Sequence, residues 1–472
     1  MQSIQQKKTK IVATIGPASR NKKVLTKMIQ EGLNVIRMNF SHGTHQDHAD
    51  TLTLVRSAEK SAKKSVAILQ DLSGPKIRVG VVEEGTFLKK GSMFILTTKK
   101  CVGNEKQAYI NYKKLPHEIS VNSRIKIDDG KKELRVTKIT GNDIHCIVVV
   151  GGPLSSNKGV NLPDSELSIS SLTTKDKKDV VFGIQHDVDF IALSFVQTAQ
   201  DIKDLRKILD KNGSRAKIIA KIETNPAIQN IDEILKIADG AMVARGDMAV
   251  EVGVEKVPLI QKMIIKKCNE LGKPVITATQ MLDSMEKSPV PTRAEVSDVA
   301  NAILDGTDAI MLSGESAVGE FPVESITTMT AIANRTEHAC KNVDLHYLDE
   351  SRDVVDTMSV SAVRIANNIR ARLIICLTES GGTAHMVARF RPHHGVIAIT
   401  PHQQVFNQLQ LLYGCKPVLD AMSGSITEVS GNIQKLVKKN KWALPGEKIV
   451  VTAGTPFGEI GSTNTVFVIE AK

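Results

Sequence analysis

Eight short runs rich in β-branched and other apolar residues alternate with helical patterns along the first two thirds of the chain. These predicted strands are KIVATIG from residue 10, LNVIRMNF from 33, VAILQDL from 66, DFIALSFV from 189, KIIAKIE from 217, GAMVARGD from 240, PVITATQ from 274 and AIMLSGE from 309. Helix signals agree, because Thr292 and Glu295 fit a capping box as N-cap and N3. The alternation predicts an α/β fold with a (β/α)₈ TIM barrel, although a doubly wound sheet shares this pattern.

Two further domains are expected, because 472 residues are too many for one hydrophobic core. After the third strand the sequence changes to short alternating segments with Gly and Asp-Gly turns, which predict a small all-β domain. A second α/β series after about residue 345 predicts an open-sheet domain. We therefore expect the barrel at 1–74 and 171–345, the inserted domain at 75–170 and a C-terminal α/β domain at 346–472.

The composition narrows the class of protein. MQSIQQKKTK at the start has no apolar signal region and no apolar run could cross a membrane, so we expect a cytoplasmic protein with no membrane partner. The six cysteines contain no CxxC pair, which indicates neither disulfides nor a zinc site. A net charge of +11 favours an acidic partner, but aromatics at 3% and scattered basic residues argue against nucleic acid.

Polar residues interrupt the predicted strands at their C-terminal ends, where the active site of such a barrel lies. In IIAKIETN (218–225), Lys221 and Glu223 are two residues apart and point to the same face of the strand. The other strand ends carry Arg37, Asn39, Ser41, Asp71, Arg245, Asp247, Thr279, Gln280, Ser313 and Glu315. A salt-bridged surface is the plain alternative for Lys221 and Glu223, but convergence from six strands favours an active site.

Glu223 and Asp247 end neighbouring strands, so their carboxylates repel each other unless a cation lies between them. Two carboxylates with positions left for water or substrate are typical of Mg²⁺. Arg37 and Lys221 nearby suit a phosphate that bridges metal and ammonium. The alternative is a structural network of charges that fills the mouth.

Two other sequence patterns give weaker indications of function. The histidines of SHGTHQDH (41–48), at positions 42, 45 and 48, are more consistent with a solvated helix start than with a metal site. The sequence has no Walker GxxxxGK[ST] and no GxGxxG, so a nucleotide would be held in another way.

Seven segments, taken in order, resemble the signature segments of the pyruvate kinase family over essentially the whole chain. They are IRMNFSHG (36–43), DLSGPKIR (71–78), KGVNLP (158–163), KIET (221–224), MVARGDM (242–248), ATQML (278–282) and MLSGESAVGEFP (311–322). The resemblance implies phosphoryl transfer from phosphoenolpyruvate to ADP, then protonation of enolpyruvate to pyruvate, with Mg²⁺ or Mn²⁺. It also implies that the insertion is a lid, that the C-terminal domain is regulatory, and that the chain forms a homotetramer.

The resemblance further implies roles for individual residues. Lys221 stabilises the transferring phosphoryl group, while Glu223 and Asp247 hold Mg²⁺. Thr279 lies beside the substrate carboxylate and the enolate, and backbone N–H groups around Gly246 and Asp247 bind that carboxylate. The phosphate and nucleotide contacts implied in the same way are Arg37, Asn39, Arg78 and Lys158. Whether Lys221 or Thr279 with water supplies the proton stays open.

One departure from the family concerns K⁺. Many members read GPEIR where this chain reads GPKIR, so Lys76 replaces a glutamate. In those members K⁺ is held by the groups that correspond to Asn39, Ser41, Asp71 and the Leu72 carbonyl. The Lys76 ammonium could supply that charge, and we therefore expect activity without K⁺. The alternative is a hinge lysine that points into solvent.

A second departure concerns the C-terminal domain. LTESGGTA (377–384) could cradle a phosphate through Thr378, Ser380, Gly381 and Thr383. Members regulated by fructose 1,6-bisphosphate often carry a basic residue where this chain has Gly382, and some use aromatic and basic groups near GTPFGEI. This chain has no basic residue in either place. We therefore expect a sugar monophosphate or nucleotide as effector, or none. An ordinary strand–helix turn is the alternative.

Three rival functions make distinct predictions. A Mg²⁺-dependent barrel lyase that acts on pyruvate or oxaloacetate units would not require ADP. A basic nucleic-acid-binding protein would lose affinity steeply with salt. A catalytically dead regulator is disfavoured by the intact set Arg37, Lys221, Glu223, Asp247 and Thr279.

Overall fold

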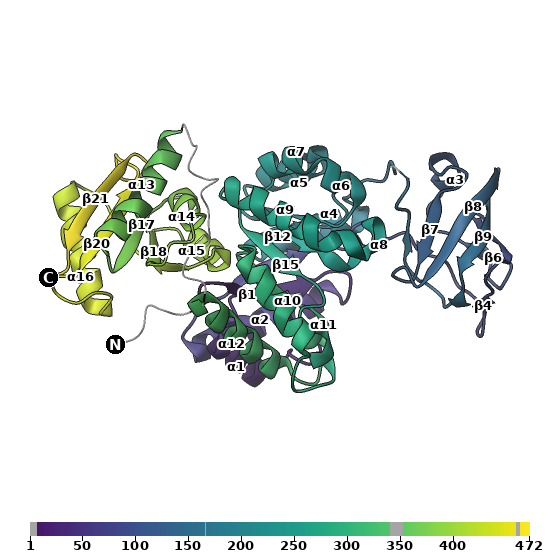
Figure 1. The fold of residues 1–472 in the computed structure, drawn as a ribbon, viewed down its shortest axis with the longest axis horizontal. Coiled ribbons are helices and arrows are strands. Elements are labelled where there is room, and N and C mark those ends of the chain that lie inside the picture. Colours follow the sequence, from purple (N-terminus) through teal and green to yellow (C-terminus); the bar gives the residue numbers. More distant parts are fainter. Residues whose placement is uncertain (1–6, 166, 340–352, 459–462) are drawn as a thin grey trace.

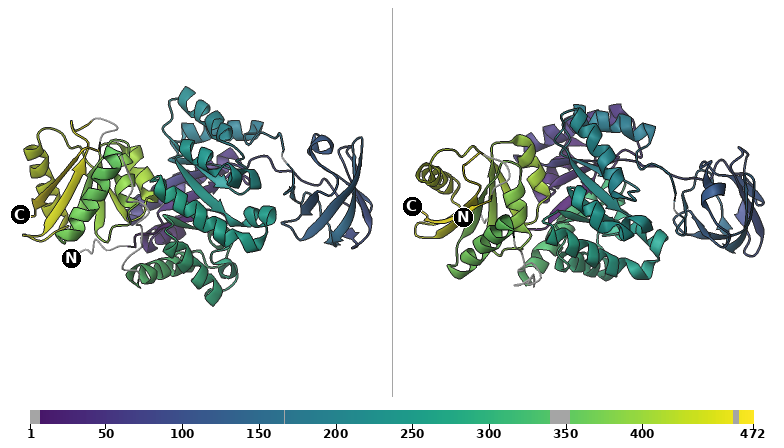
Figure 2. Two further views of the ribbon diagram at one scale, coloured as in Figure 1. Left: turned by 45° about the horizontal axis from the view of Figure 1, so that its top comes forward. Right: turned by 90° about the horizontal axis from the view of Figure 1, so that it is seen from above.

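The computed structural model describes residues 7–165, 167–339, 353–458 and 463–472. Three bodies lie in a row, with the barrel in the middle, the inserted domain on one side and the C-terminal domain on the other (Figure 1). Two rotated views show the same arrangement (Figure 2). Among the described residues, no helix combines the length and apolar character needed to span a membrane.

The predicted barrel is confirmed as a closed sheet of eight parallel strands. Around the barrel the strands are β1 (Lys10–Thr14), β2 (Val35–Asn39), β3 (Ala67–Asp71), β12 (Phe190–Leu193), β13 (Lys217–Ile222), β14 (Gly240–Ala244), β15 (Val275–Ala278) and β16 (Ala309–Leu312). Their residues are buried on both faces, which explains the unbroken apolar runs. Each strand ends one to three residues before its predicted end, because the last predicted residues belong to the turns and helices that follow.

Helices cover the outside of the barrel. They are α1 (Lys22–Glu31), α2 (His45–Ala62), α4 (Thr174–Gln185), α5 (Ala199–Lys211), α6 (Asn225–Gln229), α7 (Ile231–Ile237), α8 (Arg245–Val252), α9 (Val257–Glu270), α10 (Arg293–Leu304), α11 (Gly314–Ala317) and α12 (Pro322–Ala339), with 3₁₀ turns η1 (Val254–Lys256) and η2 (Asp283–Glu286). The capping box predicted at Thr292 and Glu295 starts α10. Apolar side chains such as Leu25, Phe40 and Met248 fill the space between strands and helices.

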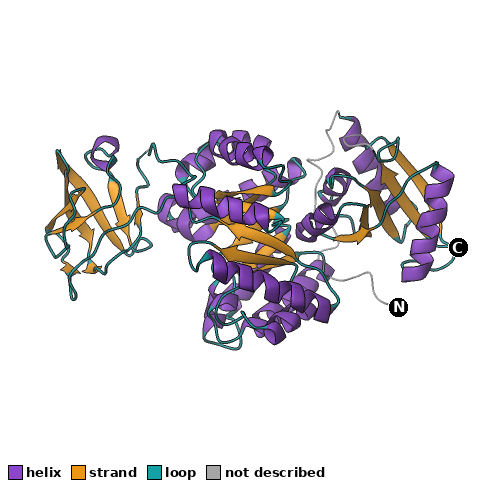
Figure 3. Ribbon diagram, turned by 180° about the vertical axis from the view of Figure 1, so that it is seen from behind, coloured by secondary structure: helices purple, strands orange, loops and turns teal. Residues whose placement is uncertain are grey.

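The inserted domain is a β structure with one short helix (Figure 3). Its elements are β4 (Phe87–Leu88), β5 (Met93–Thr97), β6 (Gln107–Tyr109), α3 (Leu115–Glu118), β7 (Arg124–Ile127), β8 (Lys132–Thr140), β9 (Asp143–Val150), β10 (Gly152–Pro153) and β11 (Val160–Asn161). One sheet runs in the order β11-β7-β8-β9-β5-β6, and β4 pairs with β10. This domain has a core of its own, which includes Phe94, Ile125 and Leu134.

The C-terminal domain is an open sheet in the order β19-β18-β17-β20-β21, with β21 antiparallel to its neighbour. Its elements are α13 (Val354–Asn368), β17 (Leu373–Leu377), α14 (Gly382–Ala388), β18 (Gly395–Thr400), α15 (Gln403–Gln408), η4 (Leu409–Leu411), β19 (Cys415–Leu419), α16 (Ile426–Asn440), β20 (Lys448–Ala453) and β21 (Thr465–Glu470). Strand β19 was not predicted from the sequence. It contains Pro417 and lies at an edge, where a strand tolerates a missing N–H.

A buried arginine joins the C-terminal domain to the N-terminal face of the barrel, away from the strand ends that carry the predicted site. Arg391 Nη1 lies 3.0 Å from Asp308 Oδ1, at the start of β16, and its Nη2 donates to Asn269 Oδ1 at 2.8 Å. The guanidinium also stacks 4.2 Å from the centre of the Tyr413 ring. The predicted site and the C-terminal domain are therefore on opposite faces of the barrel.

Candidate active site

A cavity of about 330 Å³ lies at the C-terminal mouth of the barrel, between the strand ends and the lid. Most of the site residues predicted from the sequence line it. They are Arg37, Asn39, Ser41, Asp71, Lys76, Arg78, Lys221, Glu223 and Asp247. Lid residues Asp129, Gly159 and Asn161 close the other side.

Asp71, the last residue of β3, pairs with both basic residues of the mouth. Its Oδ2 accepts a hydrogen bond from Arg37 Nε at 2.7 Å, and its Oδ1 lies 3.3 Å from Lys221 Nζ. Arg37 Nη1 also donates to Thr14 Oγ1 at 2.8 Å, at the end of β1. Burial alone would raise the pKa of Asp71, but Lys221 and Arg37 outweigh it and hold that pKa below its ordinary value.

Lys221 is held by a hydroxyl that no sequence pattern indicated. Its Nζ donates to Ser194 Oγ at 2.7 Å, and Ser194 in turn donates to the Leu72 carbonyl at 2.6 Å. Burial would lower the pKa of Lys221, but Asp71 and Glu223 outweigh it and raise that pKa. The ammonium is therefore a fixed positive charge that points into the cavity.

Glu223 follows β13 directly and is fully buried. Its Oε1 accepts from the Phe195 N–H at 2.6 Å, whereas its Oε2 has no hydrogen-bond partner among the described residues and lies 3.5 Å from Lys221 Nζ. Burial raises the pKa of Glu223 to about 7, Lys221 offsets this in part, and Asp247 adds to it. A buried carboxylate is costly unless its charge is balanced, and the ammonium at 3.5 Å leaves Oε2 without a hydrogen bond, so this atom fits a metal ligand.

The set of donors fits a hard divalent ion. No cluster of three or more His, Cys, Asp or Glu side chains placed to hold a metal occurs in the part of the chain that the structure describes. Of the carboxylates that line the cavity, Glu223 and Asp247 are the two at the ends of neighbouring strands. Mg²⁺ commonly uses one or two carboxylates and completes its shell with water and substrate oxygens. The donor chemistry of these two residues is compatible with Mg²⁺, and the metal site stays a prediction.

Thr279 and Gly246 meet beside the cavity, at the ends of β15 and β14. Gly246 N–H donates to Thr279 Oγ1 at 2.9 Å, and that hydroxyl donates to the Ala278 carbonyl at 2.6 Å. Thr279 (φ +70°) and Gln280 (φ +52°) both have left-handed backbone conformations, which are unfavourable for a β-branched residue such as Thr279 and are often found at functional sites. Neither Thr279 nor Gly246 is among the residues that line the cavity.

Several polar residues at the strand ends are used for structure instead. Arg245 turns away from the cavity, with Nη1 2.7 Å from Asp298 Oδ2 and Nη2 donating to the Thr279 carbonyl at 2.6 Å. Glu315 is buried and accepts from the Ser313 and Leu282 N–H groups at 2.7 and 3.0 Å. The expected convergence of every strand-end polar group on one point is therefore wrong for the residues that do not line the cavity, which are Arg245, Thr279, Gln280, Ser313 and Glu315.

Three basic residues of the lid, Lys76, Arg78 and Lys158, were predicted to lie at the active site, and the first two line the cavity. Lys76 is exposed at the cavity rim, and Arg78 Nη1 donates to the Asn157 carbonyl at 2.9 Å. Partial desolvation, with help from the neighbouring charges of Lys221 and Arg78, lowers the pKa of Lys76. Lys158 pairs with Asp128 at 3.0 Å and does not line the cavity.

Two of the three histidines near the start of α2 have partners. His45 Nε2 lies 2.7 Å from Asp179 Oδ1, and the His48 ring stacks on Phe40 with 3.9 Å between ring centres. Helix α2 begins at His45, whose side chain is exposed as expected, whereas His48 is partly buried.

Comparisons with known proteins agree with this geometry. The pyruvate kinase barrel-domain family matches residues 6–326, and the pyruvate kinase alpha/beta-domain family matches residues 356–469. The chain is 46% identical to pyruvate kinase 2 of Synechocystis over 99% of this chain and 80% of that protein. It is 43% identical to pyruvate kinase of Geobacillus stearothermophilus over 97% of this chain and 79% of that protein.

A solved structure of a pyruvate kinase from Cryptosporidium parvum superposes with a TM-score of 0.93 and 36% identity, covering 99% of this chain and 97% of that one. The family matches span the barrel and the C-terminal domain, and the relatives align over almost the entire chain. The chain belongs to the pyruvate kinase family.

Proposed function

We propose that this phosphotransferase forms pyruvate and ATP from phosphoenolpyruvate and ADP at the barrel mouth, with Mg²⁺ or Mn²⁺ held by Glu223 and Asp247. The observation that carries the proposal is the Oε2 atom of buried Glu223, which has no hydrogen-bond partner among the described residues and lies 3.5 Å from Lys221 Nζ. When bound, the divalent ion would supply positive charge that offsets the negative charge of the substrate phosphate. The remaining catalysis is assigned to the chain's own residues.

The basic residues would act mainly by position and charge. In the transfer, the bond between phosphorus and the enol oxygen breaks while phosphorus bonds to a terminal oxygen of ADP. Arg37 and Lys221, both tied to Asp71, would stabilise the negative charge on the transferring group. The Gly246 backbone and Thr279 would orient the substrate carboxylate, and the enolate left behind would then accept a proton. Lys221 and Thr279 with water remain the two candidate donors.

We propose that Lys76 takes the place of K⁺. It lines the same cavity as Asn39, Ser41 and Asp71 and is close enough for the charges of Asp71 and Asp247 to affect its pKa. The Leu72 carbonyl, the fourth group of the family's K⁺ set, accepts from Ser194 in this chain. Asn39 and Arg78, with Lys158 after lid movement, are the proposed nucleotide contacts.

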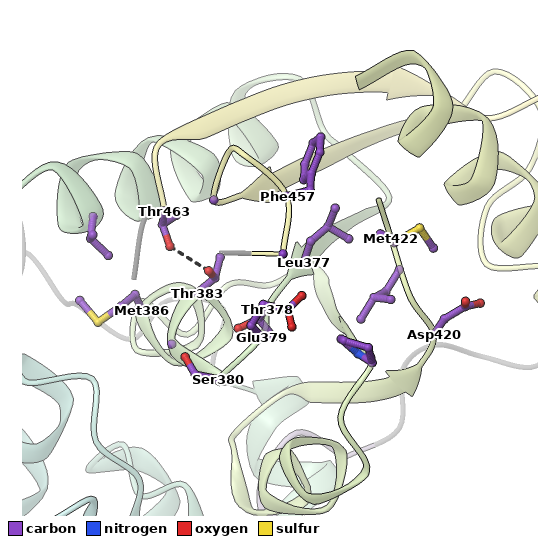
Figure 4. Close-up of a pocket in the computed structure, with 16 residues that line it drawn as sticks. Leu377, Thr378, Glu379, Ser380, Thr383, Met386, Asp420, Met422, Phe457 and Thr463 are labelled. Atoms are coloured by element: carbon purple, nitrogen blue, oxygen red, sulfur yellow. Dashed lines mark hydrogen bonds between the residues drawn. The ribbon is translucent and has the colours of Figure 1, made fainter. Parts of the chain in front are cut away.

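The C-terminal domain has a pocket of about 130 Å³ formed around the 377–384 segment (Figure 4). Thr383 and Thr463 are joined by a 2.8 Å hydrogen bond, and the Thr378 hydroxyl accepts from the Gly381 N–H at 2.9 Å. Glu379 and Asp420 line the pocket, and its described lining includes no Lys or Arg. This charge disfavours a bisphosphate most strongly. The proposal is therefore a monophosphate or nucleotide effector at Thr378, Ser380, Gly381 and Thr383, held by hydroxyl and backbone N–H groups, or no effector.

The first test is pyruvate formation from phosphoenolpyruvate and ADP with Mg²⁺, run with and without K⁺. Turnover that needs both ADP and Mg²⁺ supports the kinase, whereas turnover without ADP would support a lyase. Persistence without K⁺ supports the role of Lys76. Substrate-saturation curves with candidate sugar phosphates and nucleotides test the effector pocket, and no response to any of them would leave that pocket structural.

We also propose the homotetramer and cytoplasmic location expected of this family. Light scattering coupled to gel filtration tests the assembly, and a monomeric mass in active fractions would reject it. Fractionation of the source cells tests the location.

A further inference from the structure

Helix α8 connects the lid to the proposed metal site. Its first turn carries Gly246 and Asp247, and its last turn faces the lid. Figure 1 shows α8 on the side of the barrel nearest β7 of the lid. With a rise of about 1.5 Å per residue, Asp247 and the last turn are roughly 5 Å apart along the helix axis. A shift at one end of so short a helix therefore moves the other end.

The first turn of α8 is fastened to the barrel. Arg245 donates to the Thr279 carbonyl at 2.6 Å and pairs with Asp298 at 2.7 Å. Gly246 N–H donates to Thr279 Oγ1 at 2.9 Å. These bonds hold the helix start next to β15 but make no contact with the last turn.

The last turn of α8 is held by two lid residues. Lys126 Nζ donates to the Val250 carbonyl at 2.6 Å, and Asn161 Nδ2 donates to Glu251 Oε1 at 3.0 Å. Lys126 on β7 and Asn161 on β11 are directly opposite each other in an antiparallel pair. Two neighbouring positions of the lid thus donate hydrogen bonds to two consecutive residues of α8.

The charges of this contact suit the helix. Carbonyls in the last turn have no partner within the helix, and a cation there is favourable with respect to the helix dipole. Glu251 lies four residues after Asp247, so the two carboxylates share one face and both line the active-site cavity. Asn161 satisfies Glu251 without adding charge there.

We propose that Lys126 and Asn161 are positioning residues for phosphoryl transfer, because they let the lid set the orientation of the helix that presents Asp247 to the metal. Lid docking and metal binding then strengthen each other, since coupling between two sites is reciprocal. The proposal rests on the assignment of Asp247 as a metal ligand. A simple structural support of the lid would instead leave the Mg²⁺ dependence unchanged.

The test compares Lys126→Met with Lys126→Arg and with Lys138→Met, which removes an exposed lysine from the same lid. We expect Lys126→Met to raise the Mg²⁺ concentration for half-maximal rate about 5-fold, the lower end of usual coupling strengths, with kcat at saturating Mg²⁺ within about 2-fold. Lys126→Arg should restore most of the affinity, and Lys138→Met should match the parent. Asn161→Leu should resemble Lys126→Met.

Hydrogen exchange gives a readout that does not depend on turnover. Mn²⁺ or Mg²⁺ added to the parent protein should slow exchange both in α8 and at β7 and β11 of the lid. In Lys126→Met the protection of the lid should be lost. Unchanged Mg²⁺ dependence and unchanged lid protection in both Lys126→Met and Asn161→Leu would overturn the proposal.

The Asp247→Asn variant distinguishes a failure of the metal assignment from a failure of the positioning role of Lys126 and Asn161. A large loss of Mg²⁺ response in Asp247→Asn, with none in the lid variants, would reject the positioning role alone. No change of Mg²⁺ response in Asp247→Asn would reject the metal assignment and the positioning role together.

Discussion

Asp71 and Lys221 meet across the barrel mouth, with 3.3 Å between Asp71 Oδ1 and Lys221 Nζ, although β12 lies between their strands. The intervening strand leads directly into Ser194, whose hydroxyl accepts from Lys221 at 2.7 Å. Asp71 also holds Arg37, so one carboxylate fixes both cations that face the substrate. The position of these charges is therefore set by a residue that need not touch the substrate itself.

Asp71→Asn should lower kcat/KM for phosphoenolpyruvate about 100-fold. The amide keeps the shape of the side chain but leaves Arg37 and Lys221 to repel each other, and mispositioned charge stabilisation is worth roughly 3 kcal/mol in comparable sites. Steady-state kinetics would measure the loss. Asp204→Asn, on the exposed face of α5, is the control. A loss below 5-fold would contradict the role of Asp71.

The sequence was sufficient for the barrel and for much of the mouth. Alternation of strands and helices predicts the closed sheet, and the two-residue period of a strand puts Lys221 and Glu223 on one face. The motif resemblance added Arg78 and Lys76 on the lid side of the cavity. In these cases the information is local, because it depends on spacing along one strand or within one motif.

Contacts between segments far apart in the sequence could not be predicted from such local spacing. Ser194 is a common residue at a strand end, and nothing in DFIALSFV indicates that its hydroxyl meets Lys221. The hydrogen bond from Lys126 to the Val250 carbonyl depends on where the lid docks, and the spacing of apolar residues along the chain does not predict that position. Arg245 looked equivalent to its strand-end neighbours, but the nearby Asp298 and the Thr279 carbonyl draw it away from the cavity.

Lys76→Glu should make turnover depend on K⁺. The substitution replaces the ammonium by a carboxylate next to Asn39, Ser41 and Asp71, and the added negative charge then calls for a monovalent cation. Without K⁺ we expect activity to fall roughly 10-fold or more, and with about 100 mM K⁺, where the Debye length is about 10 Å, to recover in large part.

The matched variant for this test is Lys76→Met, which removes the positive charge without adding a negative one and should show a weaker K⁺ response. Rates measured in K⁺ and in tetramethylammonium at equal ionic strength separate specific binding from screening. Equal loss of activity in both salts for Lys76→Glu would mean that Lys76 does not stand in for K⁺.

Asp189 should make the protein less stable as the pH rises. It lies 0% exposed before β12, where its Oδ2 accepts from the Ile68 N–H at 2.7 Å and its Oδ1 has no hydrogen-bond partner by ordinary geometry among the described residues. Burial raises the pKa of Asp189 to about 7 from an ordinary value of 3.8, and an interaction with the Asn407 side chain offsets this only in part. The folded state therefore retains a proton that the unfolded state has lost.

The stability that this proton supports is fully present below the unfolded pKa and is lost as the pH rises towards the folded pKa. Between pH 5 and 7 the loss is up to about 3 kcal/mol, at roughly 1.4 kcal/mol per pH unit. Asp189→Asn keeps an acceptor for Ile68 and should remove this slope. Urea unfolding of both proteins at pH 5, 6 and 7 measures the difference, and parallel pH profiles would refute it.

Arg391→Met should weaken the joint between the barrel and the C-terminal domain. The substitution leaves the buried Asp308 carboxylate without its 3.0 Å cation and removes the guanidinium from the Tyr413 ring, at a cost of about 3–5 kcal/mol. Calorimetry should show a lower transition temperature, and Arg391→Met with Asp308→Asn should recover part of it. Arg372→Met is the control, because its Nε is 3.8 Å from Glu447 Oε2 at a partly exposed site and exposed pairs contribute below about 1 kcal/mol. A shift for Arg391→Met no larger than that of the control would mean that the joint depends on apolar packing instead.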